Sequence, residues 1–478
     1  MPAEWPNPLG LAARDSLRGT IALTLVPLLA AFALRTWTLR SLRRDPNRKS
    51  EIGERYDRLR RAFFFLNLGS VFAAVLGLGW AATVWGSSTV SRHGEEVLAP
   101  FAELAVPLPY FAILFGNWLI LFDAERALHG SMTGSESRFW SRAGYFLHHV
   151  RQLSLLVGLP VGLFVSHQTF SRFVPGVAQA DWFRIASIAS VPILIVFLPL
   201  FIKPLLGLQS MPQGRDRDRI EALARRLHFH YSDLLVWPTH GLVMNAMIVG
   251  LIPRVRYVIF TDAILEELPP DELDAVFGHE VGHARHGHIW YYALFLLLSM
   301  TVLASAFVFL EQKQEAFVVL AAAAYIFVAF GFLSRRCERQ ADVFGCRAIS
   351  CWHPNCEGHT TETTFPERGV GLCTTGIKTC ARALDRVHAM NAHGGHDDSA
   401  RTSLGTLLRD VVGWLRAWQH SPMPHRVRFL LSLIEDRGRE VRFQRRVALL
   451  RWGLVLVLIG ALGALGQTVG WRKILEVM

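Results

Sequence analysis

The sequence predicts a mainly α-helical integral membrane protein with a polar domain outside the bilayer. Of its 478 residues, 51% are hydrophobic, and the mean hydropathy of +0.28 is high for a soluble protein. The apolar residues gather in runs of about 20, the length that a helix needs to cross the bilayer core. Such runs favour several transmembrane helices over one large soluble core.

Eight runs are candidate spans, and we expect about seven or eight transmembrane helices. Pro160 interrupts the fourth run, and Pro192 and Pro199 interrupt the fifth. Membrane helices tolerate prolines whose freed carbonyls find other donors, but a re-entrant or interfacial helix is the alternative for either run. The runs are 19–38, 62–85, 100–122, 152–170, 183–203, 290–310, 316–334 and 447–467.

These runs divide the chain into five predicted parts. About five N-terminal spans precede a polar segment, a membrane hairpin, a second polar segment and a C-terminal membrane helix with its tail. The two polar segments are expected to form one domain, and the second contains a cysteine-bearing insertion. The parts are residues 1–203, 204–289, 290–334, 335–446 and 447–478.

Basic residues beside the runs predict the orientation, because cytoplasmic loops carry an excess of lysine and arginine. The loop 39–61 carries nine such residues, whereas the loop 86–99 carries only Arg92. Continuing this alternation places both polar segments in the cytoplasm, so we expect a multi-pass protein of the cell membrane. The net charge of +11 follows from this pattern. Since no nucleic-acid-binding motif accompanies the charge, nucleic acid is not an expected partner.

Local patterns predict two helices and a small β-sheet in the first polar segment. Residues 216–229 have apolar residues at helical spacing and predict an amphipathic helix. Residues 233–237 and 255–260 are short apolar runs typical of strands, and 240–250 is a third candidate. Pro270, followed by two acidic residues, predicts the start of the second helix.

The second polar segment holds all six cysteines, between Cys337 and Cys380. Residues 353–376 predict a loop insertion, and residues 391–402 have the composition of a disordered segment. Four of the cysteines, with His353 and His359 between them, could hold a second metal, but their spacing matches no common structural zinc site. Free thiols in a reducing cytoplasm are the preferred interpretation.

The stretch His279-Glu280-Val281-Gly282-His283 carries the clearest chemical signal. Two histidines four residues apart share one face of a helix and can hold one Zn²⁺. In this motif the glutamate is a general base, which takes a proton from a zinc-activated water and delivers it to the leaving amine. A chance match on a surface helix is the alternative.

A catalytic zinc ion needs a third protein ligand, with a fourth position left for water. The best candidate is Glu338, just beyond the predicted hairpin, and Asp342 lies four residues later on the same helical face. Asp342 could accept a hydrogen bond from a ligating histidine. A solvated face of an arginine-rich segment is the alternative for both acids. For His286 and His288, we prefer a contact with a neighbouring turn or a surface position.

The residues around Glu338 resemble a known family, the membrane metallopeptidases that include the CAAX prenyl proteases and the HtpX-type quality-control proteases. The family's Ser-Arg-x-x-Glu-x-x-Ala-Asp stretch is matched at Ser334, Arg335, Glu338, Ala341 and Asp342. The resemblance implies a zincin-like (gluzincin) catalytic domain with one zinc ion per chain. It also implies that Glu338 is the third ligand and that Asp342 supports the site.

Two further stretches resemble the same family. Met244-Asn245-Ala246 resembles the strand whose edge pairs with extended substrate, which would make Asn245 and Ala246 substrate-binding residues; an ordinary core strand is the alternative. The stretch from His420 to Val427 resembles a His-Pro stretch that ends in an arginine, and this places Arg426 at the active site. A cytoplasmic surface arginine is the alternative for Arg426.

The sequence therefore predicts a zinc-dependent metalloendopeptidase that hydrolyses peptide bonds of membrane-associated proteins or peptides. The expected partners are such a protein or peptide substrate and the lipid bilayer. The alternatives are a zinc-binding transporter or receptor and a non-catalytic scaffold. Within the enzyme class, CAAX-type processing and quality control of membrane proteins stay open.

Overall fold

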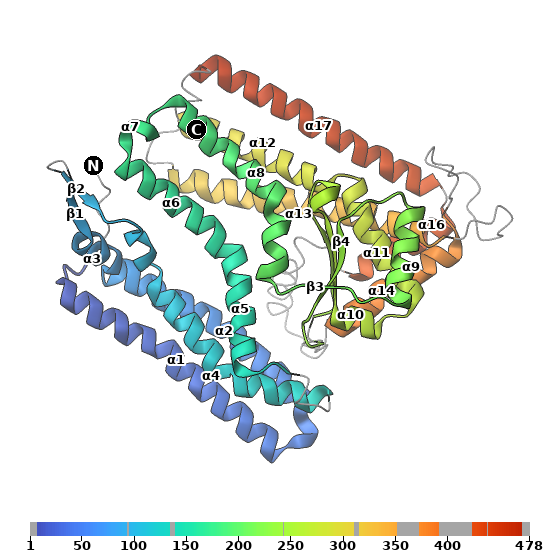
Figure 1. Cartoon of the computed structure of the whole chain (residues 1–478), viewed down its shortest axis with the longest axis horizontal. Helices are drawn as coiled ribbons and strands as arrows, with labels where there is room; N and C mark the ends of the chain where they lie inside the picture. Colours follow the sequence, from blue (N-terminus) through green and yellow to red (C-terminus); the bar gives the residue numbers. More distant parts are fainter. Residues whose placement is uncertain are drawn as a thin grey trace. The chain divides into compact units, whose positions relative to one another are not determined.

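The computed structural model describes residues 7–92, 95–133, 139–241, 243–309, 315–350, 372–391, 423–436 and 438–470. The chain forms two compact units, one of residues 1–195 with 201–207 and one of residues 196–200 with 208–478. Both units are mainly helical, as the sequence predicts (Figure 1).

The first unit is a helical bundle in which α1 packs against α2 and α4. A short hairpin, β1 with β2, follows α3 and falls in a stretch that the sequence analysis treats as a loop. The fourth apolar run is divided into α5, one π turn at residues 154–158, and α6. The elements are α1 (Ala13–Arg44), α2 (Lys49–Phe72), α3 (Trp80–Ser87), β1 (Thr89–Arg92), β2 (Glu95–Leu98), α4 (Leu108–Thr133), α5 (Arg142–Leu153), α6 (Leu159–Phe173), α7 (Pro175–Ala178) and α8 (Asp181–Leu205), of which residues 196–200 belong to the second unit.

Three helices within the described ranges are long and apolar enough to cross a membrane. They are Ala13–Arg44, Pro46–Gly77 and Gly438–Ala464. Shorter apolar helices occur at Ile193–Leu205 and His288–Ser299. This finding supports a mainly helical membrane protein, whereas the predicted number of seven or eight spans stays a prediction.

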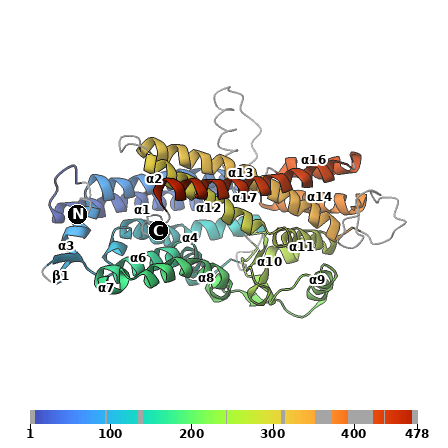
Figure 2. The same cartoon turned by 90° about the horizontal axis from the view of Figure 1, so that it is seen from above.

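The second unit combines one sheet with the helices that carry the sequence motifs. Its helix α11 packs against both α13 and the edge strand β5. Figures 1 and 2 show α17 running along α12. The elements are β3 (Gln209–Ser210), α9 (Arg215–Arg226), β4 (Asp233–Trp237), β5 (Ala246–Val249), β6 (Tyr257–Thr261), α10 (Asp262–Glu267), α11 (Pro270–Arg285), α12 (His288–Phe309), α13 (Glu315–Ala348), α14 (Thr374–Asn391), α16 (Met423–Glu435) and α17 (Gly438–Val469).

The sheet has the order β3-β4-β6-β5, with β4 and β6 parallel and β5 antiparallel to β6. The three predicted strands are present, although the strand predicted at 240–250 is confined to Ala246–Val249. The two-residue strand β3 is too short to give a sequence pattern. Since β5 lies at the end of this order, no strand of the described chain covers its outer edge.

The helices α11 and α13 approach each other closely at two glycines. A Cβ atom on Gly282 would lie 3.0 Å from the Cα atom of Ala341, and one on Gly345 would lie 2.9 Å from the carbonyl oxygen of Ala275. Backbone atoms cannot move aside as a flexible side chain can. Gly282 therefore makes room for α13 beside the metal motif, and both glycines fix the distance between the two helices.

The predicted loop insertion lies mostly outside the described residues. Its last five positions, 372–376, are described, and α14 begins among them at Thr374. The prediction of a loop is therefore wrong at 374–376, and the buried contacts of Leu372 and Ile377 with the core explain why the helix starts early. The predicted disordered segment 391–402 is described only at Asn391, which ends α14.

We expect Gly345→Ala to destabilise the protein. The added methyl group meets backbone atoms of α11, and overpacking of this kind typically costs about 1–3 kcal/mol. Thermal unfolding in detergent should show a lower Tm. Gly453→Ala is the control, because no atom lies within 4 Å of its Cβ position on α17. An unchanged Tm for Gly345→Ala would contradict the close helix contact.

Candidate metal centre

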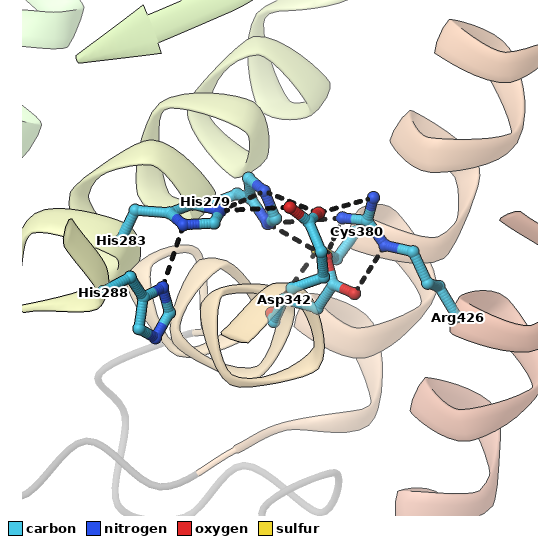
Figure 3. Close-up of polar contacts among 7 residues, drawn as sticks. His279, His283, His288, Asp342, Cys380 and Arg426 are labelled. Carbon is cyan, nitrogen blue, oxygen red and sulfur yellow. Dashed lines mark hydrogen bonds and ion pairs between the residues drawn. The ribbon is translucent and has the colours of Figure 1, made fainter. Parts of the chain in front are cut away.

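Three helices bring the predicted site residues together (Figure 3). Helix α11 supplies His279, Glu280 and His283, and helix α13 supplies Glu338. His279 Nε2 lies 3.8 Å from one carboxylate oxygen of Glu338, and His283 Nε2 lies 3.7 Å from the other. The two Nε2 atoms are 3.2 Å apart. Across the part of the chain that the structure describes, this is the one cluster of metal-ligating side chains.

These distances fit a zinc ion at the centre of the cluster. Ligand atoms about 2.1 Å from a tetrahedral zinc ion lie about 3.4 Å from one another, and the observed separations are 3.2–3.8 Å. His279, His283 and Glu338 would supply three ligand atoms to such an ion and leave a fourth position for another ligand. An open fourth position is the arrangement of catalytic rather than structural zinc sites.

Hydrogen bonds behind the histidines favour the same conclusion. His279 Nδ1 lies 2.9 Å from Asp342 Oδ1. A carboxylate only accepts, so Nδ1 must donate, and a neutral His279 then turns a lone pair toward the cluster. The pKa of His279 is raised: burial opposes the charged form, but the hydrogen bond and charge of Asp342 outweigh it. A second nitrogen, His283 Nε2, faces the same point, and a cation between the two satisfies both.

Arg426 on α16 forms ion pairs with both Glu338 and Asp342. Its guanidinium contacts Asp342 at 2.5 Å and 2.9 Å and contacts Glu338 at 3.0 Å. Burial opposes ionisation of Asp342, but the charge of Arg426 and its hydrogen bonds lower the pKa of that carboxyl. Arg426 is 3% exposed and is not a surface residue. Arg426 thereby holds Glu338 within the cluster and Asp342 behind His279.

Glu280 faces the cavity beside the cluster. Burial raises its pKa to about 7, while the charge of His279 and the backbone N–H of Ile248, whose hydrogen bond the carboxylate accepts, oppose the rise. A divalent cation nearby favours the ionised carboxylate. A carboxylate that titrates near the working pH can both take up and release a proton.

A cavity of about 930 Å³ surrounds the cluster, and Asn245, Ala246 and Glu280 line it. The main-chain carbonyl of Asn245 points toward β6, because it accepts a hydrogen bond from the Thr261 N–H at 3.0 Å. Antiparallel pairing alternates along a strand. The backbone groups of Ala246 and Ile248 therefore point away from β6, toward the cavity.

The structure also places residues that the sequence reasoning missed or misjudged. His288 is buried, and its ring contacts His283 (Figure 3). Ile248 and Cys380 line the same cavity. A single histidine or cysteine has no partner at a fixed sequence spacing that would predict a site. Only the packing of α12 and α14 therefore shows where His288 and Cys380 lie. Of the proposed second metal site, Cys351, Cys356 and the two histidines lie outside the described residues, and Cys373 and Cys380 are buried free thiols.

Comparison with known proteins agrees with the predicted resemblance. Residues 211–355 match Peptidase family M48. The CAAX prenyl protease 1 homolog of Dictyostelium discoideum is 30% identical over 146 residues, which are 30% of this chain and 32% of that protein. CAAX prenyl protease 1 of Saccharomyces cerevisiae is 26% identical over 159 residues, which are 32% of this chain and 34% of that protein. The matched stretches span about a third of these relatives.

Among solved structures, the crystal structure of S. mikatae Ste24p aligns with this chain. The alignment covers 87% of this chain and 98% of the Ste24p chain, with 14% sequence identity and a TM-score of 0.49. The family match and the curated relatives confirm the resemblance that the sequence predicts.

We expect the purified protein to hold one zinc ion per chain and Glu338→Ala to lose it. Removal of a ligand should cost more than the roughly 10–100-fold in affinity that loss of an outer partner costs. Elemental analysis and competition with a chromophoric chelator measure both quantities. Glu435→Ala is the control, because Glu435 is an exposed acid of the same unit. Wild-type affinity in Glu338→Ala would show that another group is the third ligand.

Proposed function

We propose, on the premise that residues 211–355 are a domain of peptidase family M48, that the chain is a membrane-embedded zinc endopeptidase. The observation that carries the proposal is one cavity that holds three ligand atoms, a glutamate and an uncovered strand edge. His279, His283 and Glu338 are the proposed zinc ligands. A structural zinc site would need neither an open ligand position nor an adjacent base.

Zinc, when bound, acidifies a water molecule and polarises the scissile carbonyl. The chain's own residues do the rest. Glu280 takes the proton of the attacking water on its carboxylate and passes it to the leaving amine. Asp342 keeps His279 in the tautomer that exposes Nε2. Arg426 keeps Asp342 ionised and holds both Asp342 and Glu338 in place.

The strand edge is the proposed binding site for the substrate backbone. Ala246 and Ile248 present backbone groups toward the cavity, so an extended peptide can add to β5 as a further strand. Asn245 lies next to this edge and lines the cavity. Because the Ile248 N–H donates to Glu280, the groups proposed to pair with a peptide are the Ile248 carbonyl and the backbone of Ala246, and a peptide paired there lies beside the base.

The predicted membrane organisation belongs to the same proposal. We propose seven or eight spans and a catalytic domain made of residues 204–289 and 335–446. We also propose that this domain lies on the cytoplasmic side of the cell membrane. Three described apolar helices and the basic stretch 39–61, where α1 ends and α2 begins, support the proposal. A hairpin between the two polar segments would hold the zinc site at the membrane surface.

For the substrate, we favour CAAX-type processing over quality control. The support is that the curated relatives are named CAAX prenyl proteases and that apolar side chains line much of the cavity, among them Ile264, Leu384 and Met423. A prenylated peptide anchors in the bilayer through its lipid and presents a short C-terminal segment.

We expect Glu280→Gln to keep zinc but to lose about 10²–10⁴-fold in kcat, the usual contribution of a positioned acid or base. The amide preserves the shape of the side chain and cannot take up the proton. A fluorogenic peptide assay with parallel zinc analysis measures both effects. Glu267→Gln, an exposed glutamate that ends α10, is the matched control. Full proteolysis by Glu280→Gln would refute the role of the base.

We expect a farnesylated peptide ending in Cys-aliphatic-aliphatic-X to be cleaved with a higher kcat/KM than the same peptide without the lipid. The lipid raises the local concentration of the peptide at the membrane and adds apolar contacts. Cleavage of both peptides in proteoliposomes, followed by mass spectrometry, measures the ratio. Faster cleavage of an unmodified, unfolded membrane protein would favour quality control instead.

A further inference from the structure

His288, the first residue of α12, has a position that the proposed mechanism does not use. Its side chain is 1% exposed. Its Nδ1 lies 2.9 Å from Nδ1 of His283 (Figure 3), the nitrogen of that ring that faces away from the metal cluster. A buried polar ring that contacts a proposed zinc ligand is placed to orient that ligand.

The contact continues through two glutamines to the C-terminal helix. His288 Nε2 lies 3.1 Å from Oε1 of Gln340 on α13. Gln340 Nε2 donates at 2.6 Å to Oε1 of Gln444 on α17. Four helices, α11, α12, α13 and α17, therefore contribute one residue each to a continuous row of side-chain hydrogen bonds.

The direction of every hydrogen bond in this row matches the needs of metal binding. A neutral imidazole carries one proton. If Nε2 of His283 binds a metal, Nδ1 carries the proton and donates to His288 Nδ1. His288 then carries its own proton on Nε2 and donates to Gln340 Oε1, which leaves the Gln340 amide to donate to Gln444. If the hydrogen bonds ran in the opposite direction, His283 would carry its proton on Nε2, the nitrogen proposed to bind the metal.

We infer that His288 is a positioning residue that fixes the ring orientation and tautomer of His283, and that Gln340 and Gln444 fix His288 in turn. The inference rests on the proposed zinc site. It gives α17 a role in that site, although none of the proposed ligands lies on this helix.

Further contacts hold α17 against the site-bearing helices. Arg451 Nη2 donates at 2.6 Å to the carbonyl oxygen of His286, at the end of α11. The Arg451 guanidinium also lies 3.9 Å from the ring centre of Tyr291 on α12. Nearer its start, α17 pairs Glu440 with Arg347 of α13. Gln444 thus lies between two anchored points, so its amide has a defined position.

Two substitutions of His288 separate the two ends of its ring. An asparagine amide can accept at the position of Nδ1, so His288→Asn keeps the acceptor for His283 and loses Gln340. A glutamine amide reaches the position of Nε2, so His288→Gln keeps Gln340 and loses that acceptor. We expect His288→Asn to bind zinc within a few-fold of wild type and His288→Gln to bind about 10–100-fold more weakly.

The measurements are the zinc dissociation constant by chelator competition, the visible spectrum of the Co²⁺-substituted protein and the Tm of the metal-free protein. A purely structural role for His288 predicts equal effects of the two substitutions on zinc affinity and a matching fall in Tm. A positioning role predicts a changed Co²⁺ spectrum in His288→Gln with a similar metal-free Tm. Equal zinc affinities for wild type and His288→Gln would overturn the inference.

A second pair of variants tests the distal end of the row. Gln444→Leu removes the acceptor for Gln340, whereas Gln444→Glu keeps it, so we expect zinc binding that is at most a few-fold weaker in the first variant alone, no larger a loss than in His288→Asn. Equal affinities in the two would refute the role of α17. A wild-type protein that binds no zinc would refute the proposed function and the inference together. Wild-type zinc binding that His288→Gln leaves unaltered would refute only the inference.

Discussion

The close approach of α11 and α13 is the constraint on which the metal centre depends. A Cβ atom on Gly345 would lie 3.1 Å from the backbone nitrogen of His279, so the two helices touch through their main chains at the first ligand. At this spacing the short side chains of Asp342 and Glu338 reach the histidines directly. A methyl group on Gly345 would meet the backbone of α11, so the two helices, and with them the acids, would have to move apart.

The charged side chains of the site favour the binding of a cation. Glu338, Asp342 and Arg426 are at most 4% exposed, and buried ions need partners because removal from water costs several kcal/mol each. Two carboxylates and one guanidinium leave one negative charge uncompensated. A divalent cation at the point where the histidine and Glu338 atoms converge would offset that charge and would add bonds to the three proposed ligands.

The sequence predicts those parts of the site that local geometry determines. His279 and His283, like Glu338 and Asp342, lie four residues apart on single helices, and helical periodicity alone places each pair on one face. Arg426 follows Asp342 by 84 residues, so only the resemblance to a family places it at the site. The strand β5 is shorter than predicted because the preceding residues turn: His240 and Gly241 have φ values of 57° and 79°, incompatible with an extended strand.

The two histidines that we propose as ligands are chemically equivalent in the sequence but differ in the folded protein. His279 has a charged acceptor, Asp342, behind its ring, whereas His283 has a neutral one, His288. Burial and the charge of His279 lower the pKa of His283 well below the usual value, whereas Asp342 raises the pKa of His279 against the effect of burial. Behind the ring of His283, at Nδ1, the contact is with the neutral His288. We therefore infer that the orientation of this ring depends on neutral hydrogen bonds that run from α12 through α13 to α17.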